Sequence, residues 1–97
     1  MLRYFFLGFV RIHILHHAER ESIFGTGIRD ELASHGYDLS FGTLYPILHG
    51  LEKQGYLTSY DEVVNGKVRK YYKTTEAGTA ALREAKEKIS ELVEEVL

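Results

Sequence analysis

The stretch from Ser40 to Thr74, SFGTLYPILHGLEKQGYLTSYDEVVNGKVRKYYKT, contains in order a short helix, a stop and a basic two-stranded ribbon. Ser40 and Thr43 are both N-cap candidates, because a hydroxyl accepts hydrogen bonds from the unpaired N–H groups of a first helical turn. Gly55 is the expected stop, since glycine takes positive φ without steric cost. Between these signals, apolar residues recur at helical spacing, at Leu44, Ile47, Leu48 and Leu51.

The dipeptide Asn65-Gly66 lies between runs rich in Val, Tyr and Thr, a pattern that predicts a hairpin with a type I′ turn. A two-residue loop fixes the register of the two strands. Two of the resulting cross-strand pairs carry opposite charges and one is aromatic: Asp61 with Lys70, Glu62 with Arg69, and Tyr60 with Tyr71. Such pairs each contribute roughly 0.2 to 1 kcal/mol, so the side chains support the register that the turn dictates.

Pro46 leaves the start of the helix open. In a helix interior a proline removes a backbone hydrogen bond and clashes with the carbonyl four residues earlier, whereas in a first turn it costs little. A start at Thr43 would place Pro46 in the first turn, and a start at Ser40 would distort the turn that precedes it. In both cases we expect irregular backbone near Gly42 and Thr43, with N–H groups free to bind phosphate.

Two more helices are expected before this segment. The first covers residues 2 to about 17, followed by a loop at residues 18–22, and the second starts after Gly25-Thr26-Gly27 and runs toward His35 with Gly36 as its stop. Two helices joined by a short glycine-containing turn, followed by a hairpin, form a winged helix-turn-helix. The predicted fold class is therefore mainly α with a small β-hairpin (α+β).

Length and composition indicate one small core. The chain has 97 residues, of which 44% are hydrophobic, and no cysteine, so disulfides and thiolate metal sites are excluded. The absence of cysteine fits a cytoplasmic protein. The opening apolar run is short for a signal peptide, lacks a cleavage site of small residues, and is too short to span a bilayer, so we expect it to be the first core helix.

Charge is distributed unevenly although the formal net charge is only −2. Residues 40–75 carry a local net charge of +2, and residues 76–97 carry −3. This asymmetry would orient the chain on a polyanion, with the acidic C-terminal segment facing away.

The last segment has the periodicity of a heptad seam. Thr74 and Thr75 are cap candidates, and the apolar residues that follow recur at spacings of three and four, at Leu82, Ala85, Ile89, Leu92 and Val96, with Val93 widening the stripe. The stripe could pack on the protein's own first helix. We favour self-association through these six residues, with help from the first helix, because a small domain without disulfides gains stability by oligomerising.

Two motifs resemble the PadR-like transcriptional regulators: GTLYPILHGLEKQGYL at positions 42–57 and VRKYYKTTEAG at positions 68–78. The resemblance implies a winged helix-turn-helix in residues 1–75 and a dimerisation helix in residues 76–97. It also implies a homodimer that binds double-stranded operator DNA, usually as a repressor, and that a small-molecule effector sometimes releases.

The candidate DNA contacts are Ser40, Thr43, Tyr45 and His49 on the helix, and Lys67 and Arg69 on the ribbon. The N-terminal part of such a helix enters the major groove, and hydroxyls often hold phosphates. Each candidate also has a structural alternative: helix capping by the two hydroxyls, packing by the tyrosine, or a solvated basic face on the ribbon. We discount Lys70 because Asp61 opposes it, and we place Tyr72 against the core.

Three histidines near the end of the first helix suggest a metal-responsive regulator as an alternative, since His13 and His17, four residues apart, could share an ion, with His16 between them. No third ligand from elsewhere is evident, so no metal site and no cofactor is assigned. No nucleophile elbow, phosphate loop or carboxylate pair supports an enzyme. A winged-helix module that binds proteins instead of DNA is the remaining alternative.

Overall fold

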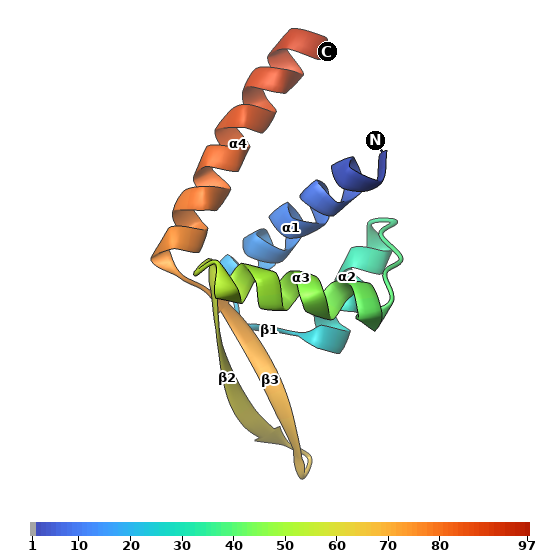
Figure 1. The fold of residues 1–97 in the computed structure, drawn as a ribbon, viewed down its shortest axis with the longest axis vertical. Helices are drawn as coiled ribbons and strands as arrows, with labels where there is room; N and C mark the ends of the chain where they lie inside the picture. The colour runs from blue at the N-terminus through green and yellow to red at the C-terminus, as the bar shows by residue number, and fades with distance from the viewer. Residues whose placement is uncertain (1) are drawn as a thin grey trace.

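A computed structural model describes residues 2–97 as four helices and one three-stranded antiparallel sheet (Figure 1). The elements are α1 (Leu2–Arg20), β1 (Ile23–Phe24), α2 (Gly25–Ser34), α3 (Phe41–Lys53), β2 (Leu57–Val64), β3 (Lys67–Thr74) and α4 (Glu76–Val96). The helix-turn-helix, the ribbon and the long C-terminal helix follow in the expected order, which confirms the predicted α+β fold.

The hairpin forms in the predicted register. Residues 57–64 of β2 pair with residues 67–74 of β3, and Asp61 lies opposite Lys70. The turn residues Asn65 and Gly66 have φ angles of 51° and 78°, the left-handed values that a type I′ turn requires at both positions. The ring centroids of Tyr60 and Tyr71 lie 5.4 Å apart in a stacked arrangement, so the aromatic pair also forms.

A third strand was missed by the sequence prediction. Ile23 and Phe24 form β1, which pairs with Tyr72 and Tyr71 of β3 and gives the sheet the order β1-β3-β2. This strand has only two residues and its partner lies almost fifty residues away, so no local periodicity reveals it. It attaches the wing to the segment that enters α2.

Two helix boundaries were also predicted wrongly. Helix α1 continues to Arg20, into the segment expected to be a loop, because Ala18 is buried in the core and no breaker interrupts the helix. Helix α2 begins at Gly25 and not after Gly27, since β1 delivers an extended Phe24 directly to its first turn. The end of α2 is as expected, with Gly36 at a φ of 89°.

Helix α3 begins at Phe41 with Ser40 as its N-cap, which settles the choice that Pro46 left open. The hydroxyl of Ser40 accepts a hydrogen bond from the backbone N–H of Thr43 at 3.3 Å, and that N–H also lies 3.1 Å from the Ser40 carbonyl. The expectation of a free N–H at Thr43 was therefore wrong. Pro46 lies inside the helix, in its second turn.

The core lies between α1, α2, α3 and the base of the sheet. Its fully buried side chains include Val10, Ile14, Leu32, Leu44, Leu48, Leu57, Tyr72 and Leu82. Tyr72 is only 1% exposed, which confirms its predicted place against the core, and burial raises the pKa of its hydroxyl. One residue of the C-terminal helix, Leu82, thus belongs to the core of the subunit.

The wing and α4 are joined without a flexible linker. Thr74 ends β3, and Thr75 caps α4 by accepting a hydrogen bond from the N–H of Gly78 at 3.0 Å. The Thr75 hydroxyl donates to the carbonyl of Gly55 at 2.6 Å, and its backbone N–H donates to the carbonyl of Tyr56 at 3.2 Å. These bonds fix the start of α4 to the end of α3.

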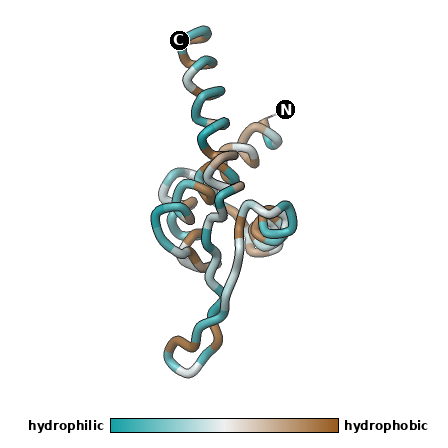
Figure 2. The backbone as a smooth tube through the Cα atoms, turned by 90° about the vertical axis from the view of Figure 1, so that its left-hand side faces the viewer, coloured by the Kyte–Doolittle hydropathy of each residue, from teal (hydrophilic) through white to brown (hydrophobic). Residues whose placement is uncertain are grey.

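The hairpin and α4 extend from the helical body in opposite directions (Figures 1 and 2). The chain measures 51 Å along its longest axis and 20 Å along its shortest. Val63 and Val68 near the tip of the hairpin are mostly exposed, and Figure 2 shows hydrophobic and hydrophilic stretches side by side at this end of the wing. Within residues 2–97, none of the helices combines the length and apolar character needed to cross a membrane.

Candidate nucleic-acid interface

A groove of about 780 Å³ separates α3 from the wing. Helix α3 contributes Tyr45 and His49 to its lining, and the strands and turn of the wing contribute Val64, Asn65, Lys67, Val68, Arg69, Lys70 and Tyr72. Its third side is the start of α2, with Phe24, Gly25 and Thr26. Four of the six predicted DNA-contact residues therefore line one groove: Tyr45, His49, Lys67 and Arg69.

Three aromatic rings form a row along α3, because residues four apart lie on one helix face. The rings of Phe41 and Tyr45 stack with centroids 5.3 Å apart, and those of Tyr45 and His49 stack with centroids 6.3 Å apart. Tyr45 also crosses to α2, where Gly25 leaves room for it: a Cβ at Gly25 would lie 2.7 Å from the tyrosine hydroxyl oxygen. Tyr45 is 39% exposed, so it packs and remains accessible at once.

Arg29, on α2, contacts Phe41 at the start of this row of rings. Its Nε donates to the carbonyl of Leu39 at 3.0 Å, and its guanidinium carbon lies 4.5 Å from the centroid of the Phe41 ring. Both contacts hold the turn that leads into α3. The sequence prediction assigned no role to Phe41 or Arg29, and only the i, i+4 spacing of Phe41, Tyr45 and His49 could have indicated the row.

Arg69 is held by an aromatic ring and not by a carboxylate. Its guanidinium carbon lies 4.1 Å from the centroid of Phe24, and none of the ion pairs within residues 2–97 joins Arg69 to Glu62 or Lys70 to Asp61. The charges face each other in register, but on an exposed ribbon this gives little attraction. An ion pair with Asp61 was therefore the wrong reason to discount Lys70, which lines the groove as an exposed cation.

Ser40 and Thr43 lie at the start of α3, outside the groove lining. The Ser40 hydroxyl caps the helix and lies 3.3 Å from the hydroxyl of Thr43, so both groups make local contacts. Thr43 is not the cap. The structural alternative that the sequence left open thus holds for Ser40, and both hydroxyls could still meet a phosphate from the exposed side.

Thr26 is a groove residue that the sequence prediction missed. It lies in the first turn of α2, where the N-cap residue Phe24 offers no side-chain hydrogen bond to the N–H groups. Unpaired N–H groups at a helix N-terminus attract anions. The Gly25-Thr26-Gly27 sequence at a helix start could have indicated this, had the start been placed at Gly25.

The geometry is that of a DNA-reading module: an exposed helix face beside a basic wing. The family model of the transcriptional regulator PadR-like family matches residues 14–84, which covers both elements. The chain belongs to the PadR-like family of transcriptional regulators. It is therefore a DNA-binding regulator of transcription and not an enzyme, as the sequence indicated.

Known PadR-like proteins resemble the chain over nearly its whole length. The transcriptional regulator Rv3488 of Mycobacterium tuberculosis is 48% identical over 96 residues, which are 99% of this chain and 90% of that protein. The crystal structure of a PadR family regulator from Eggerthella lenta has a TM-score of 0.82 and 36% identity, covering 92% of this chain and 79% of that one. A PadR-like regulator from Bacillus cereus gives a TM-score of 0.83 at 27% identity, with coverages of 92% and 88%.

The six predicted dimerisation residues of this PadR-like chain divide into two groups along α4. Leu82 is buried in the subunit core, and Ala85 and Ile89 are half-buried. Leu92, Val93 and Val96 are exposed by 50%, 46% and 64%. The first three residues of the stripe therefore pack within the subunit, and the last three leave apolar surface exposed; self-association through this surface stays a prediction.

Helix α1 also carries exposed apolar side chains near its start, of which Tyr4 and Phe5 lie beside α4. Leu2, Tyr4, Phe5 and Phe6 are each at least half exposed. An apolar groove of about 270 Å³ connects the two helices, lined by Tyr4, Phe5, Gly8, Phe9, Ile12, Lys88, Ile89 and Leu92. The apolar residues of this groove, together with the exposed Val93 and Val96 of α4, form the surface that we call the α1–α4 surface.

Proposed function

We propose that this PadR-like regulator binds a palindromic operator as a homodimer and represses transcription. In this proposal α3 enters the major groove and the wing contacts the adjacent backbone or minor groove. Residues 1–75 act as the reading unit and residues 76–97 as the dimerisation helix. The observation that carries the proposal is the groove in which Tyr45 and His49 face Lys67, Arg69 and Lys70.

The polar groups around this groove differ in what they can contact. Lys67, at the wing tip, and Lys70 are exposed cations, which suit phosphates. Arg69 is held over the ring of Phe24 and not by a carboxylate, so its guanidinium N–H groups can donate to a phosphate or to a base edge. His49 projects from the exposed face of α3 and is the best placed of the helix residues to reach a base edge.

Few cations per subunit face the DNA, so one subunit alone should bind weakly and lose affinity steeply with salt. A dimer would double the contacts and would cover the exposed apolar side chains of the α1–α4 surface. Exposed apolar patches of this kind mark association surfaces in soluble proteins. Its position at the end opposite the wing fits a symmetric dimer that presents two wings to one face of the duplex (Figure 1).

We also propose that a small-molecule effector releases the protein from its operator. The groove between α1 and α4 supports it, since an apolar ligand there would contact Phe9, Ile89 and Leu92 directly. Such a ligand would change how the two helices pack and thereby the separation of the two reading units. Denaturation and sedimentation in the presence of planar aromatic compounds would test this part separately.

A selection of bound genomic fragments tests the main proposal. The full-length protein should enrich a palindrome whose half-sites lie about one helical turn apart, roughly 34 to 36 Å. Tyr45→Phe and Lys67→Ala should both weaken binding to the enriched site, and transcription from a promoter carrying it should rise when the protein is removed. A protein-interaction module would enrich no palindrome, and unchanged affinity of both variants would refute the assigned contacts.

A further inference from the structure

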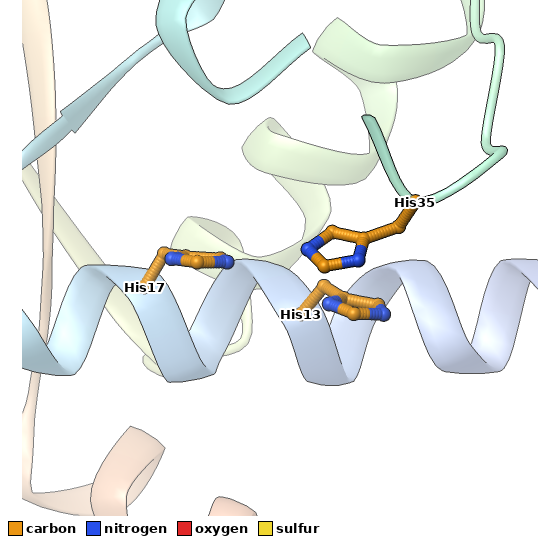
Figure 3. A group of neighbouring side chains, drawn as sticks. All are labelled: His13, His17 and His35. Carbon is orange, nitrogen blue, oxygen red and sulfur yellow. The ribbon is translucent and has the colours of Figure 1, made fainter. Parts of the chain in front are cut away.

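Three histidine side chains, two from α1 and one from the turn after α2, gather on one side of α1. His13 and His17 lie one helical turn apart on α1, and His35 follows the last residue of α2 (Figure 3). One ring nitrogen from each lies within 4.8 Å of those of the other two. His35 supplies the third nitrogen that the sequence alone did not provide.

Of the three histidines of α1, only His13 and His17 belong to this group. His16 is not part of the group, although its ring meets the ring of His17 edge-on at 5.0 Å between centroids. The ring of His35 instead stacks on that of His13, with centroids 4.8 Å apart and planes inclined by 27°. The cluster therefore consists of His13, His17 and His35.

A carboxylate completes the surroundings of this cluster. The Oε1 atom of Glu31, on α2, lies 3.4 Å from Nε2 of His17 and 3.2 Å from Nε2 of His35. Its negative charge favours a cation at this place. Burial lowers the pKa of the His13 imidazole, and the neighbouring His35 and His17 lower it further.

We propose that His13, His17 and His35 bind one divalent transition-metal ion per chain, with Glu31 providing charge or a fourth ligand atom. Imidazole nitrogens suit zinc, nickel, cobalt and copper. Three nitrogens around a tetrahedral zinc ion at about 2.0 to 2.1 Å lie roughly 3.3 to 3.4 Å apart, so the cluster needs only a small contraction. This inference is independent of the proposed DNA contacts, none of which takes part.

Binding requires more than one ring to turn, since the rings of His13 and His17 are also nearly parallel, with planes inclined by 11°. The lone pairs of an imidazole lie in its ring plane, so the nearly parallel rings of His13 and His35 cannot both direct a nitrogen at one ion. His35 is freer to turn than His17, because it is about half exposed and lies at a helix end, whereas His17 is largely covered. Metal binding would thus break the stack of the His13 and His35 rings and link α1 to the end of α2 through the ion.

Isothermal titration of the full-length, chelator-treated protein with zinc chloride tests the site. Wild-type protein should bind one zinc ion per chain at micromolar metal. His35→Ala should weaken binding by at least about 10-fold, and Glu31→Gln should weaken it by a smaller factor. His16→Ala is the matched control, since it removes a neighbouring histidine outside the cluster and should leave the affinity unchanged.

Two further measurements keep the result interpretable. Circular dichroism melting of each variant identifies loss of fold. X-ray absorption at the zinc edge should show a coordination shell that includes three imidazole nitrogens at about 2.0 Å. No heat of binding at micromolar zinc would overturn the proposal. So would a His35→Ala variant that is folded and binds as tightly as the wild type, or a His16→Ala variant that loses binding.

Discussion

The guanidinium of Arg69 lies over the ring of Phe24, with its carbon 4.1 Å from the ring centroid. This contact joins the wing to the short strand that leads into α2. It also fixes a cation at the rim of the groove without neutralising it, which a carboxylate partner would do. The orientation of Arg69 therefore depends on an aromatic residue that carries no charge of its own.

Replacing Phe24 by leucine should weaken DNA binding although the charge of the protein is unchanged. A cation–π contact at an exposed site contributes about 0.5 to 1 kcal/mol, so the affinity of a dimer that loses two such contacts should fall roughly 5- to 30-fold on a selected operator. Fluorescence anisotropy would measure it. Val63→Ala, an exposed change on the outer strand, should have no such effect. Equal affinities of a folded Phe24→Leu variant and the wild type would contradict the role given to this contact.

Removing the charge of Lys67 should change the salt dependence of DNA binding. Each lost phosphate contact lowers the slope of log affinity against log salt by about 1, so a dimer with two copies of Lys67→Ala should lose roughly 2. Arg83→Ala removes an equal charge from the exposed side of α4 and serves as the control. If both variants change the slope equally, Lys67 makes no specific phosphate contact.

Charges on the free half of α4 should convert the proposed dimer into monomers. Leu92→Glu combined with Val96→Glu places two carboxylates on the α1–α4 surface, where desolvating them opposes association. Sedimentation velocity should show the mass of one chain, and DNA affinity should fall at low protein concentration. Ser90→Glu adds charge on the outward side of the same helix and should leave the dimer intact. A monomeric wild-type protein at micromolar concentration would refute the dimer directly.

Gly78 should tolerate no side chain. A Cβ there would lie 2.2 Å from the carbonyl oxygen of Tyr56, a backbone atom that cannot move alone, so Gly78→Ala should lower the free energy of unfolding by about 1 to 3 kcal/mol. Gly50→Ala is the matched helical control, because nothing lies within 4 Å of its Cβ position. It should raise stability by roughly 0.5 to 1 kcal/mol through helix propensity. Chemical denaturation measures both, and equal effects would contradict the close approach.

Local signals were sufficient where neighbours in sequence determine the structure. Asn65-Gly66 fixed the hairpin and its register, and the spacing from Leu44 to Leu51 identified the buried face of α3. The same signals could not reveal β1, whose pairing with Tyr72 depends on the folded sheet. They also misplaced the start of α2, since glycine at its first position is explained only by the ring of Tyr45 packed against it.

The candidate site was predicted in parts. The sequence identified Tyr45, His49, Lys67 and Arg69, but opposite charges in register suggested ion pairs that the structure does not contain. Cross-strand register places two backbones side by side and does not decide where long side chains turn. Arg69 turns to Phe24, a residue of another strand. His35 likewise meets His13 only because α1 and α2 pack together, a contact between residues 22 positions apart.

The hydrogen bonds of Thr75 hold the junction between the wing and α4, so these two elements cannot rotate freely relative to each other. In the proposed dimer each reading unit would then be rigidly attached to the helix that sets its partner's position. Inserting one base pair between half-sites rotates them by about 35° and separates them by about 3.4 Å, which such an assembly could absorb only by bending the DNA. The protein would therefore select operators by the distance between their half-sites as well as by their sequence.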